Sequence, residues 1–451
     1  MYNKLSDEKL QGLSNFGLGF PETDPSATRI CILGGGFAGL FTALDFYKRY
    51  RSSHQVKNSK LQSCQIILIE QRDHFLFTPL LYELVTNELQ TWEIAPSYQQ
   101  LLAQTSIQFC RATVEAVNLK QRQIQLLSGA FLSYDYLVLA GGGQTNLVGC
   151  PGVDDHAYPF RTLADVDRLK ERLHHLEQSD RRLIQIAIVG GGPSGVELAG
   201  KLADRLKARG RIDLVEQGEQ ILNGFTPASR AMARRALSSR QVQILTKARV
   251  LALDADQISL ELQGQVEWRP VDLVLWTVGN RLPAWVDQLD CQHSPRGQLL
   301  TTPTLQLWDY PEVLALGDLA EIRDEGKPVP STAQAAVQQA KCAARNLQAM
   351  LNGKRQRRFQ YLHLGEMLTL GTDAAVVSSF GLTVGGDLAC LTRRSVYLQR
   401  LPTFRHRRQV LWQWLIRWWL KLISGWRCQL KRTTSKRQQY SLSDTPLRTK
   451  L

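Results

Sequence analysis

The sequence predicts an α/β fold with two Rossmann-like dinucleotide-binding domains and a helical segment at its C-terminal end. A unit of apolar strand, glycine-rich turn and helix begins at Arg29, and the same unit recurs at Leu183. Because a chain of 451 residues is long enough for several cores, the two units indicate two separate modules. A basic, Trp-rich stretch then begins near residue 391, and it predicts the C-terminal segment.

The first turn, GGGFAG, follows the strand RICIL and precedes a helix. Its Gly34, Gly36 and Gly39 satisfy G-x-G-x-x-G, which makes a tight turn, lets the backbone approach a pyrophosphate and packs the helix on the strand. The next strand, QIILIE, ends in Glu70, whose carboxylate can accept hydrogen bonds from ribose hydroxyls. A polar insert at 49–63 explains why this strand comes late. A purely structural glycine turn is the alternative.

The second turn, GGGPSG, places Gly190, Gly192 and Gly195 in the same pattern, and its following strand ends in Glu216. A carboxylate at that position binds a free 2'-hydroxyl and repels a 2'-phosphate, which favours NADH over NADPH. Arg211, at the start of the strand, could still admit NADPH.

The stretch EVLALGD ends a third apolar strand at Asp318. Together with YDYLVLAGGG at 134–143, it resembles the two-dinucleotide-binding flavoproteins, whose second flavin motif ends in Gly-Asp. The resemblance implies FAD as a cofactor, with Asp318 holding a ribityl hydroxyl. An ordinary turn at a strand end is the alternative for this residue.

A narrower resemblance lies in GGGFAGL, FLFTPLLYEL, WEIAP, GGGPSGVELAG and PSTAQAAVQQA. These stretches are similar to the type II NAD(P)H:quinone dehydrogenases from about residue 29 to the Trp-rich end. The sequence of residues 75–96 is most similar to the cyanobacterial and plastid branch of this family. That branch implies reduction of demethylphylloquinone, a step in vitamin K1 formation, or of plastoquinone, by NAD(P)H through FAD. Nothing in the sequence builds a transmembrane proton route, so no ion pumping is expected.

A helix is predicted from about 331 to 350, because Ser331 and Gln334 form a capping-box pattern. By resemblance, its N-terminus points at the flavin, and its dipole stabilises the negative charge of the reduced ring. The resemblance also places Ala333, Gln334, Gln338 and Gln339 at the quinone pocket. Gln334 and Gln338 share a helix face, so both could reach one ligand carbonyl. The alternative, considered above all for Gln339, is a solvated glutamine.

Glu197, two residues after the second glycine turn, resembles the family's acid near the nicotinamide. It could position that ring or relay a proton to the quinone. A carboxylate at a helix start could instead only complement the helix dipole.

The basic charge is confined to the C-terminal end. Of 55 basic and 41 acidic residues, 15 and one lie in 391–451, which leaves 40 of each in the rest. The chain therefore predicts an anionic partner at this end and no nucleic-acid binding. Residues 410–426 hold five Trp, with Gln413, Arg417, Lys421 and Ser424 in one polar stripe.

This segment is too short to span a bilayer and predicts an anchor in the membrane plane, bound to anionic lipid through 405–437. The expected location is the cytoplasmic face of a thylakoid or plasma membrane. A core or dimer helix is the alternative, and a homodimer stays open. No secretory signal is expected at the polar N-terminus.

These observations predict five segments. They are a polar leader (1–28), the first part of the FAD domain (29–155), the NAD(P)H domain (156–285), the second part of the FAD domain (286–385) and the anchor with its tail (386–451).

Two other functions remain at this stage. A sulfide:quinone oxidoreductase needs reactive cysteines beside the flavin, and Cys150 and Cys342 are candidates among eight scattered cysteines, which are otherwise expected to be free thiols. No metal site is expected. A membrane-tethered flavoprotein scaffold, similar to apoptosis-inducing-factor-like proteins, is the alternative from a different class.

Overall fold

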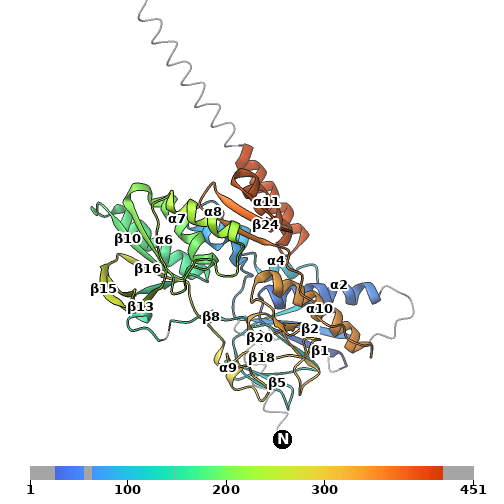
Figure 1. Ribbon diagram of the computed structural model, residues 1–451. Coiled ribbons are helices and arrows are strands. Elements are labelled where there is room, and N and C mark those ends of the chain that lie inside the picture. The colour runs from blue at the N-terminus through green and yellow to red at the C-terminus, as the bar shows by residue number, and fades with distance from the viewer. Residues whose placement is uncertain (1–25, 55–62, 148, 420–451) are drawn as a thin grey trace, which may run out of the picture. The chain divides into compact units, whose positions relative to one another are not determined.

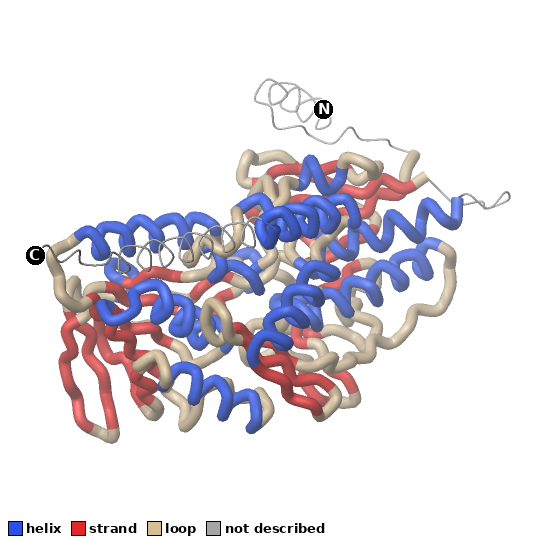
Figure 2. The backbone as a smooth tube through the Cα atoms, turned by 90° about the horizontal axis from the view of Figure 1, so that it is seen from above, coloured by secondary structure: helices blue, strands red, loops and turns tan. Residues whose placement is uncertain are grey.

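The computed structural model describes residues 26–54, 63–147 and 149–419, and it contains two five-stranded parallel sheets. Figure 2 shows strands and helices mixed along the chain, as the α/β prediction requires. The chain divides into two compact units, Met1–Arg394 and Ser395–Leu451.

The first sheet has the strand order β19-β7-β1-β2-β3. Its strands are β1 (Thr28–Leu33), β2 (Cys64–Glu70), β3 (Gln108–Arg111), β7 (Tyr136–Leu139) and β19 (Val313–Ala315). Ile30, Cys31 and Ile32 of the central strand are fully buried, as expected for a parallel sheet covered on both faces. Helices α2 (Phe37–His54) and α10 (Ala333–Leu351) pack side by side in this part of the chain (Figure 1).

The second sheet has the strand order β12-β11-β10-β16-β9. Its strands are β9 (Ala157–Pro159), β10 (Ile184–Val189), β11 (Gly210–Val215), β12 (Gln243–Leu245) and β16 (Leu273–Trp276). Helices α6 (Leu163–Gln178), α7 (Pro193–Leu206) and α8 (Pro227–Ser238) belong to the same region. Val189, Val215 and Val274 lie in its buried core. The division into five predicted segments stays a prediction.

Three antiparallel sheets of three strands each complete the larger elements. They are β4 (Val114–Asn118), β5 (Gln123–Leu126) and β6 (Phe131–Ser133); β13 (Ala248–Leu253), β14 (Gln257–Leu262) and β15 (Gln265–Pro270); and β23 (Glu366–Thr369), β24 (Ala375–Ser379) and β25 (Leu382–Gly385). The last set forms two consecutive β-hairpins within residues 366–385.

The remaining elements are short. The helical ones are η2 (Thr78–Leu84), α3 (Thr91–Ile94), α4 (Tyr98–Leu102), α5 (Val153–His156), η3 (Lys207–Arg209), α9 (Ala284–Asp287) and η4 (Gly317–Leu319). The short strands are β8 (Gln144–Thr145), β17 (Asn280–Arg281), β18 (Leu299–Leu300), β20 (Ala320–Glu321), β21 (Arg323–Asp324) and β22 (Lys327–Pro328).

The predicted start of α10 is wrong in one detail. The N-cap is Thr332, whose hydroxyl accepts a hydrogen bond from Ala335 N, so Ser331 and Gln334 do not form a capping box. Thr332 has the extended backbone that an N-cap needs, and the Gln334 side chain binds elsewhere.

The C-terminal part begins with α11 (Gly386–Arg400), and a further helix covers 404–419. In that helix Trp412, Trp418 and Trp419 are exposed, whereas Gln413 and Arg417 of the predicted polar stripe are half-buried. The rest of the predicted anchor, 420–437, lies outside the described residues. No helix within the described ranges is long and apolar enough to cross a membrane.

Candidate active site

Two glycine turns of the same geometry follow β1 and β10, the central strands of the two parallel sheets. Gly34 and Gly190 have φ values of +97° and +115°, which side chains other than glycine rarely adopt. A Cβ at Gly39 would lie 1.8 Å from Gly34 O, and one at Gly195 would lie 1.9 Å from Gly190 O. The first glycine therefore makes the turn and the third lets the helix approach it.

The second glycine of each turn faces open space. A Cβ added at Gly36 or Gly192 would meet no protein atom within 4 Å. The turns lead directly into α2 and α7, whose first N–H groups have no partner inside their helices. Both positions thus have the room and the donors that a pyrophosphate needs.

An acidic residue at the end of the next strand contacts each turn. Glu70 accepts a hydrogen bond from Gly35 N over 2.8 Å, and Glu216 accepts one from Gly191 N over 2.6 Å. The second Glu216 oxygen accepts from Gly218 N, also over 2.6 Å. Each acid thus binds the turn beside which a ribose would follow the pyrophosphate. Glu216 keeps lone pairs for hydroxyl donors, whereas Glu70 also accepts hydrogen bonds from Arg72 N and Nε, each over 3.2 Å.

The predicted flavin-side turn is tied to α10. Gly317, with a φ of +70°, donates its N–H to Gln339 Oε1 over 2.8 Å. Gln339 is only 3% exposed, so the alternative that it is a solvated glutamine is wrong. The neighbouring Asp318 accepts a hydrogen bond from Arg161 over 3.1 Å, a partner that the sequence did not reveal.

Gln334 and Gln338 hold the loop at 361–365 to α10. Gln334 Oε1 accepts from Leu364 N over 3.1 Å, and its amide donates to Gly365 O over 3.4 Å. Gln338 exchanges two hydrogen bonds with the backbone of Leu362, over 2.8 and 2.9 Å. The two amides share one helix face, as predicted, but they bind this loop in the structure.

Glu197 is a buried acid with specific partners. Its carboxylate accepts a hydrogen bond from Thr369 N over 3.0 Å, and the Tyr82 hydroxyl also hydrogen-bonds it. Burial raises the pKa of Glu197 to about 7, against the lowering effects of the Arg393 charge and these hydrogen bonds. An acid that titrates near neutral pH can hold or release a proton. A residue that only complements a helix dipole does not need such a raised pKa.

A buried ion pair between Arg393 and Glu83 acts electrostatically on Glu197. Arg393 of α11 donates to the Tyr82 hydroxyl over 2.6 Å and to Glu83 over 2.7 Å. The sequence did not reveal this group, although Tyr82 and Glu83 belong to the FLFTPLLYEL stretch that carries the family resemblance. The distance in sequence, 310 residues between Glu83 and Arg393, is what hid it.

Gln334 and Gln338, predicted at the quinone pocket, and Glu197, predicted near the nicotinamide, contact the chain at opposite ends of β23. The loop bound by Gln334 and Gln338 precedes this strand, and Thr369 at its end donates to Glu197. Four strand residues span roughly 13 Å. Glu197 and the two glutamines therefore do not touch one another, but they border the same strand.

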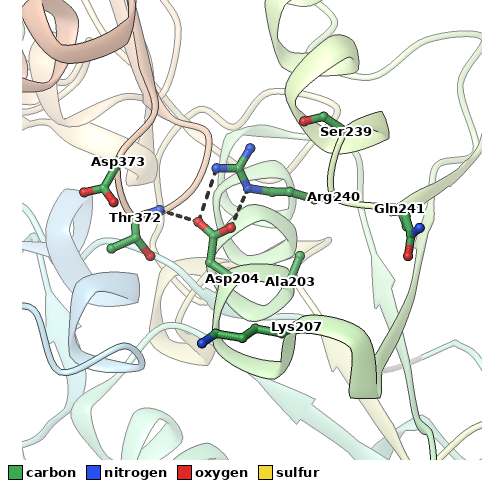
Figure 3. A pocket seen from close by; sticks show the side chains of 8 residues that line it. All are labelled: Ala203, Asp204, Lys207, Ser239, Arg240, Gln241, Thr372 and Asp373. Atoms are coloured by element: carbon green, nitrogen blue, oxygen red, sulfur yellow. Dashed lines mark hydrogen bonds and ion pairs between the residues drawn. The ribbon is translucent and has the colours of Figure 1, made fainter. Parts of the chain in front are cut away.

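A cleft of about 510 Å³ lies elsewhere, between α7, α8 and the 372–373 turn (Figure 3). Asp204 accepts from Arg240 and from Thr372 N there, over 2.7 and 2.6 Å. None of the predicted site residues lines this cleft. Asp204, Arg240 and the Thr372 amide bind one another, so this part of the cleft has a structural role.

The cysteines argue against sulfide chemistry. Burial raises the pKa of Cys150 and of Cys342, whereas a reactive thiol needs a lowered one. Cys150 packs against the core of the second sheet, and Cys342 lies beside Arg357 O. The cysteines are free throughout the described ranges, where no group of His, Cys, Asp and Glu could hold a metal ion either.

Residues 28–340 match the family described as pyridine nucleotide-disulphide oxidoreductase. The chain belongs to this family. It is 45% identical over 394 residues to the demethylphylloquinone reductase NdbB of Synechocystis sp., covering 86% of this chain and 96% of that protein. It is 37% identical over 429 residues to the alternative NAD(P)H-ubiquinone oxidoreductase C1 of Arabidopsis thaliana, covering 87% and 81%. The predicted resemblance to type II NAD(P)H:quinone dehydrogenases is confirmed.

The fold agrees with that of solved oxidoreductase structures. NDH2 of Plasmodium falciparum, solved with NADH, matches with a TM-score of 0.74 at 18% identity, covering 85% of this chain and 97% of the other. The sulfide:quinone oxidoreductase of Aquifex aeolicus matches with a TM-score of 0.70 at 18% identity, covering 83% and 91%. The family member described here is an oxidoreductase with FAD and NAD(P)H as its cofactors.

Proposed function

We propose that the protein transfers electrons from NAD(P)H through FAD to a membrane naphthoquinone, with demethylphylloquinone as the native acceptor and plastoquinone as a further one. The observation that carries this proposal is the 45% identity to a demethylphylloquinone reductase over nearly the full length of both chains. The two glycine turns, each with its own acidic partner, support it because the reaction needs two dinucleotides in one chain.

The residues present fit the two cofactors. Gly36 with Glu70 would hold the FAD pyrophosphate and ribose, and Asp318 a ribityl hydroxyl. Gly192 with Glu216 would hold the corresponding groups of NADH. FAD supplies the two-electron exchange between nicotinamide and quinone when it is bound.

The chain's own groups manage charge and protons. Ala333 begins α10, a 19-residue helix that Gln339 ties to the Gly317–Asp318 turn. The positive dipole end of this helix would stabilise negative charge on the reduced flavin. Glu197 stores a proton near neutral pH and can pass it to a reduced quinone, with Tyr82 fixing the carboxyl. Gln334 and Gln338 border the quinone path by holding the loop at 361–365.

We also propose that the protein works at the cytoplasmic face of a membrane. The acceptor resides in lipid, whereas the donor is dissolved in water. The exposed Trp412, Trp418 and Trp419 suit the headgroup zone, and basic residues flank them in the sequence.

Anaerobic half-reactions test the function. NADH or NADPH is added to the purified yellow protein, and the reduced protein is then mixed with a set of naphthoquinones and benzoquinones. We expect bleaching by the nucleotide and fastest reoxidation by naphthoquinones. A protein that is bleached but reoxidised by no quinone would refute the proposed acceptor.

A further inference from the structure

The β24–β25 hairpin has an unusual residue at its tip. Ser379 pairs with Leu382, which leaves a two-residue turn of Phe380 and Gly381 with φ values of +49° and +81°. Such a turn strongly favours Asn-Gly, because both residues must adopt a positive φ. A bulky Phe in this conformation opposes local stability, so its presence indicates another role.

The surface around the tip is apolar and open. Phe380 is 84% exposed and Leu382 is 74% exposed. β25 is an edge strand, and no charged residue occurs in 375–385. Edge strands often carry charges that prevent unwanted pairing, and this short edge carries none, so it is open to an apolar partner.

This surface is joined to the loop at the proposed quinone path. Ser379 Oγ donates to Leu364 O over 2.7 Å. Leu362 and Leu364, on the same loop, are also exposed, and the loop is held to α10 by Gln334 and Gln338. The apolar surface therefore continues from the hairpin tip to the loop that borders the proposed quinone path.

We propose that the hairpin tip, residues 379–382, inserts into the surface of a lipid bilayer as a second membrane contact, separate from the Trp-rich C-terminal segment. The inference rests on the proposed function, since a quinone delivered from lipid must enter where the protein meets the bilayer. A stable protein interface uses roughly 20–30 residues on each partner, far more than the hairpin tip and the neighbouring loop provide. Lipid chains accept an isolated apolar tip without a matching surface.

Phe380→Asn tests the inference in the full-length holoprotein. Asn tolerates the positive φ of this turn, so the melting temperature should stay the same or rise. Affinity for phosphatidylcholine–phosphatidylglycerol vesicles, measured by co-sedimentation, should fall by roughly tenfold, because a buried aromatic side chain is lost. Phe131→Asn, which changes a 56%-exposed Phe on β6, should leave the affinity unchanged.

Hydrogen–deuterium exchange locates the contact. Amides of 379–383 should exchange more slowly when vesicles are added to the wild-type protein. The inference would be overturned if exchange at these amides did not change, or if Phe380→Asn bound vesicles as well as the wild type does. It would also be overturned if protection depended on protein concentration in the absence of vesicles, which would indicate a second copy of the chain as the partner. The wild type and Phe380→Asn should oxidise NADH at the same rate with a water-soluble quinone. If the wild type did not oxidise NADH at all, the proposed function would be refuted, and not this inference.

Discussion

Arg393 donates to the Glu83 carboxylate over 2.7 Å, with the two side chains only 3% and 2% exposed. A buried charge without its partner is strongly destabilising, by about 3–5 kcal/mol. We therefore expect Glu83→Leu to lower the free energy of unfolding by that amount in a urea titration. The double variant Glu83→Leu/Arg393→Met should lose much less, because no unpaired charge remains. Losses that simply add would show that the pair has no such coupling.

Glu197 should make stability depend on pH. Its pKa is raised to about 7 in the folded chain, from 4.5 in the absence of burial. Burial of Glu197 therefore does not lower the free energy of unfolding below pH 4.5. The loss of stability grows as the pH rises from 4.5 to about 7 and is complete above that pH. Relative to the wild type, Glu197→Gln should gain on the order of 3 kcal/mol between about pH 4 and pH 8. Parallel stability curves for the two proteins would contradict the raised pKa.

The two later glycines of the second turn should respond differently to alanine. Gly192→Ala meets no protein atom, so the fold and bound FAD should persist while NADH affinity falls by about tenfold, the loss expected from ~1.4 kcal/mol of phosphate contacts. Gly195→Ala puts a methyl group 1.9 Å from Gly190 O and should lower the melting temperature. Titration of the oxidised protein with NADH and thermal unfolding separate the two effects. Normal NADH affinity in Gly192→Ala would show that the phosphates lie elsewhere.

Loss of the loop contacts should affect one half-reaction. Gln334→Ala removes the acceptor of Leu364 N and Tyr361 Oη, so the loop at the proposed quinone path loses its position on α10. Stopped-flow mixing should show slower reoxidation by quinone and unchanged reduction by NADH. Gln348→Ala, on the same helix, serves as the control. Equal slowing of both half-reactions by Gln334→Ala would place this residue outside the quinone path.

Deletion of 405–451 should weaken membrane attachment strongly and leave reduction of water-soluble quinones intact. The Trp and basic residues of this segment provide the proposed attraction to lipid, at about 1 kcal/mol for each basic residue near an anionic surface. Vesicle co-sedimentation measures the loss. The residual affinity should disappear when Phe380→Asn is added. Full attachment of the deletion variant would contradict the anchor.

The sequence predicted what depends on local spacing. The strands and helices around Gly34 and Gly190 follow from apolar runs beside a turn that only glycine tolerates, and both acids at the strand ends contact the turns. The start of α10 was misjudged by one residue, because Ser331 and Thr332 are both good caps and local sequence does not choose between them.

Contacts between distant residues could not be predicted. The Gln334 amide finds its partners about 30 residues later, and Arg393 reaches Tyr82 across 311 residues. Arg161 and Asp318 likewise meet only in the folded chain. A single sequence carries no signal for such pairs, since they follow from how the elements pack.

The carboxylates of Glu70 and Glu216 are already fixed by backbone N–H groups before any dinucleotide arrives. These two side chains therefore lose their conformational entropy when the chain folds, and not when the ligand binds. A receptor prepared in this way needs little rearrangement when the nucleotide enters or leaves. At Glu216, on the proposed NADH side, the expected benefit is rapid exchange of the oxidised nucleotide for the reduced one.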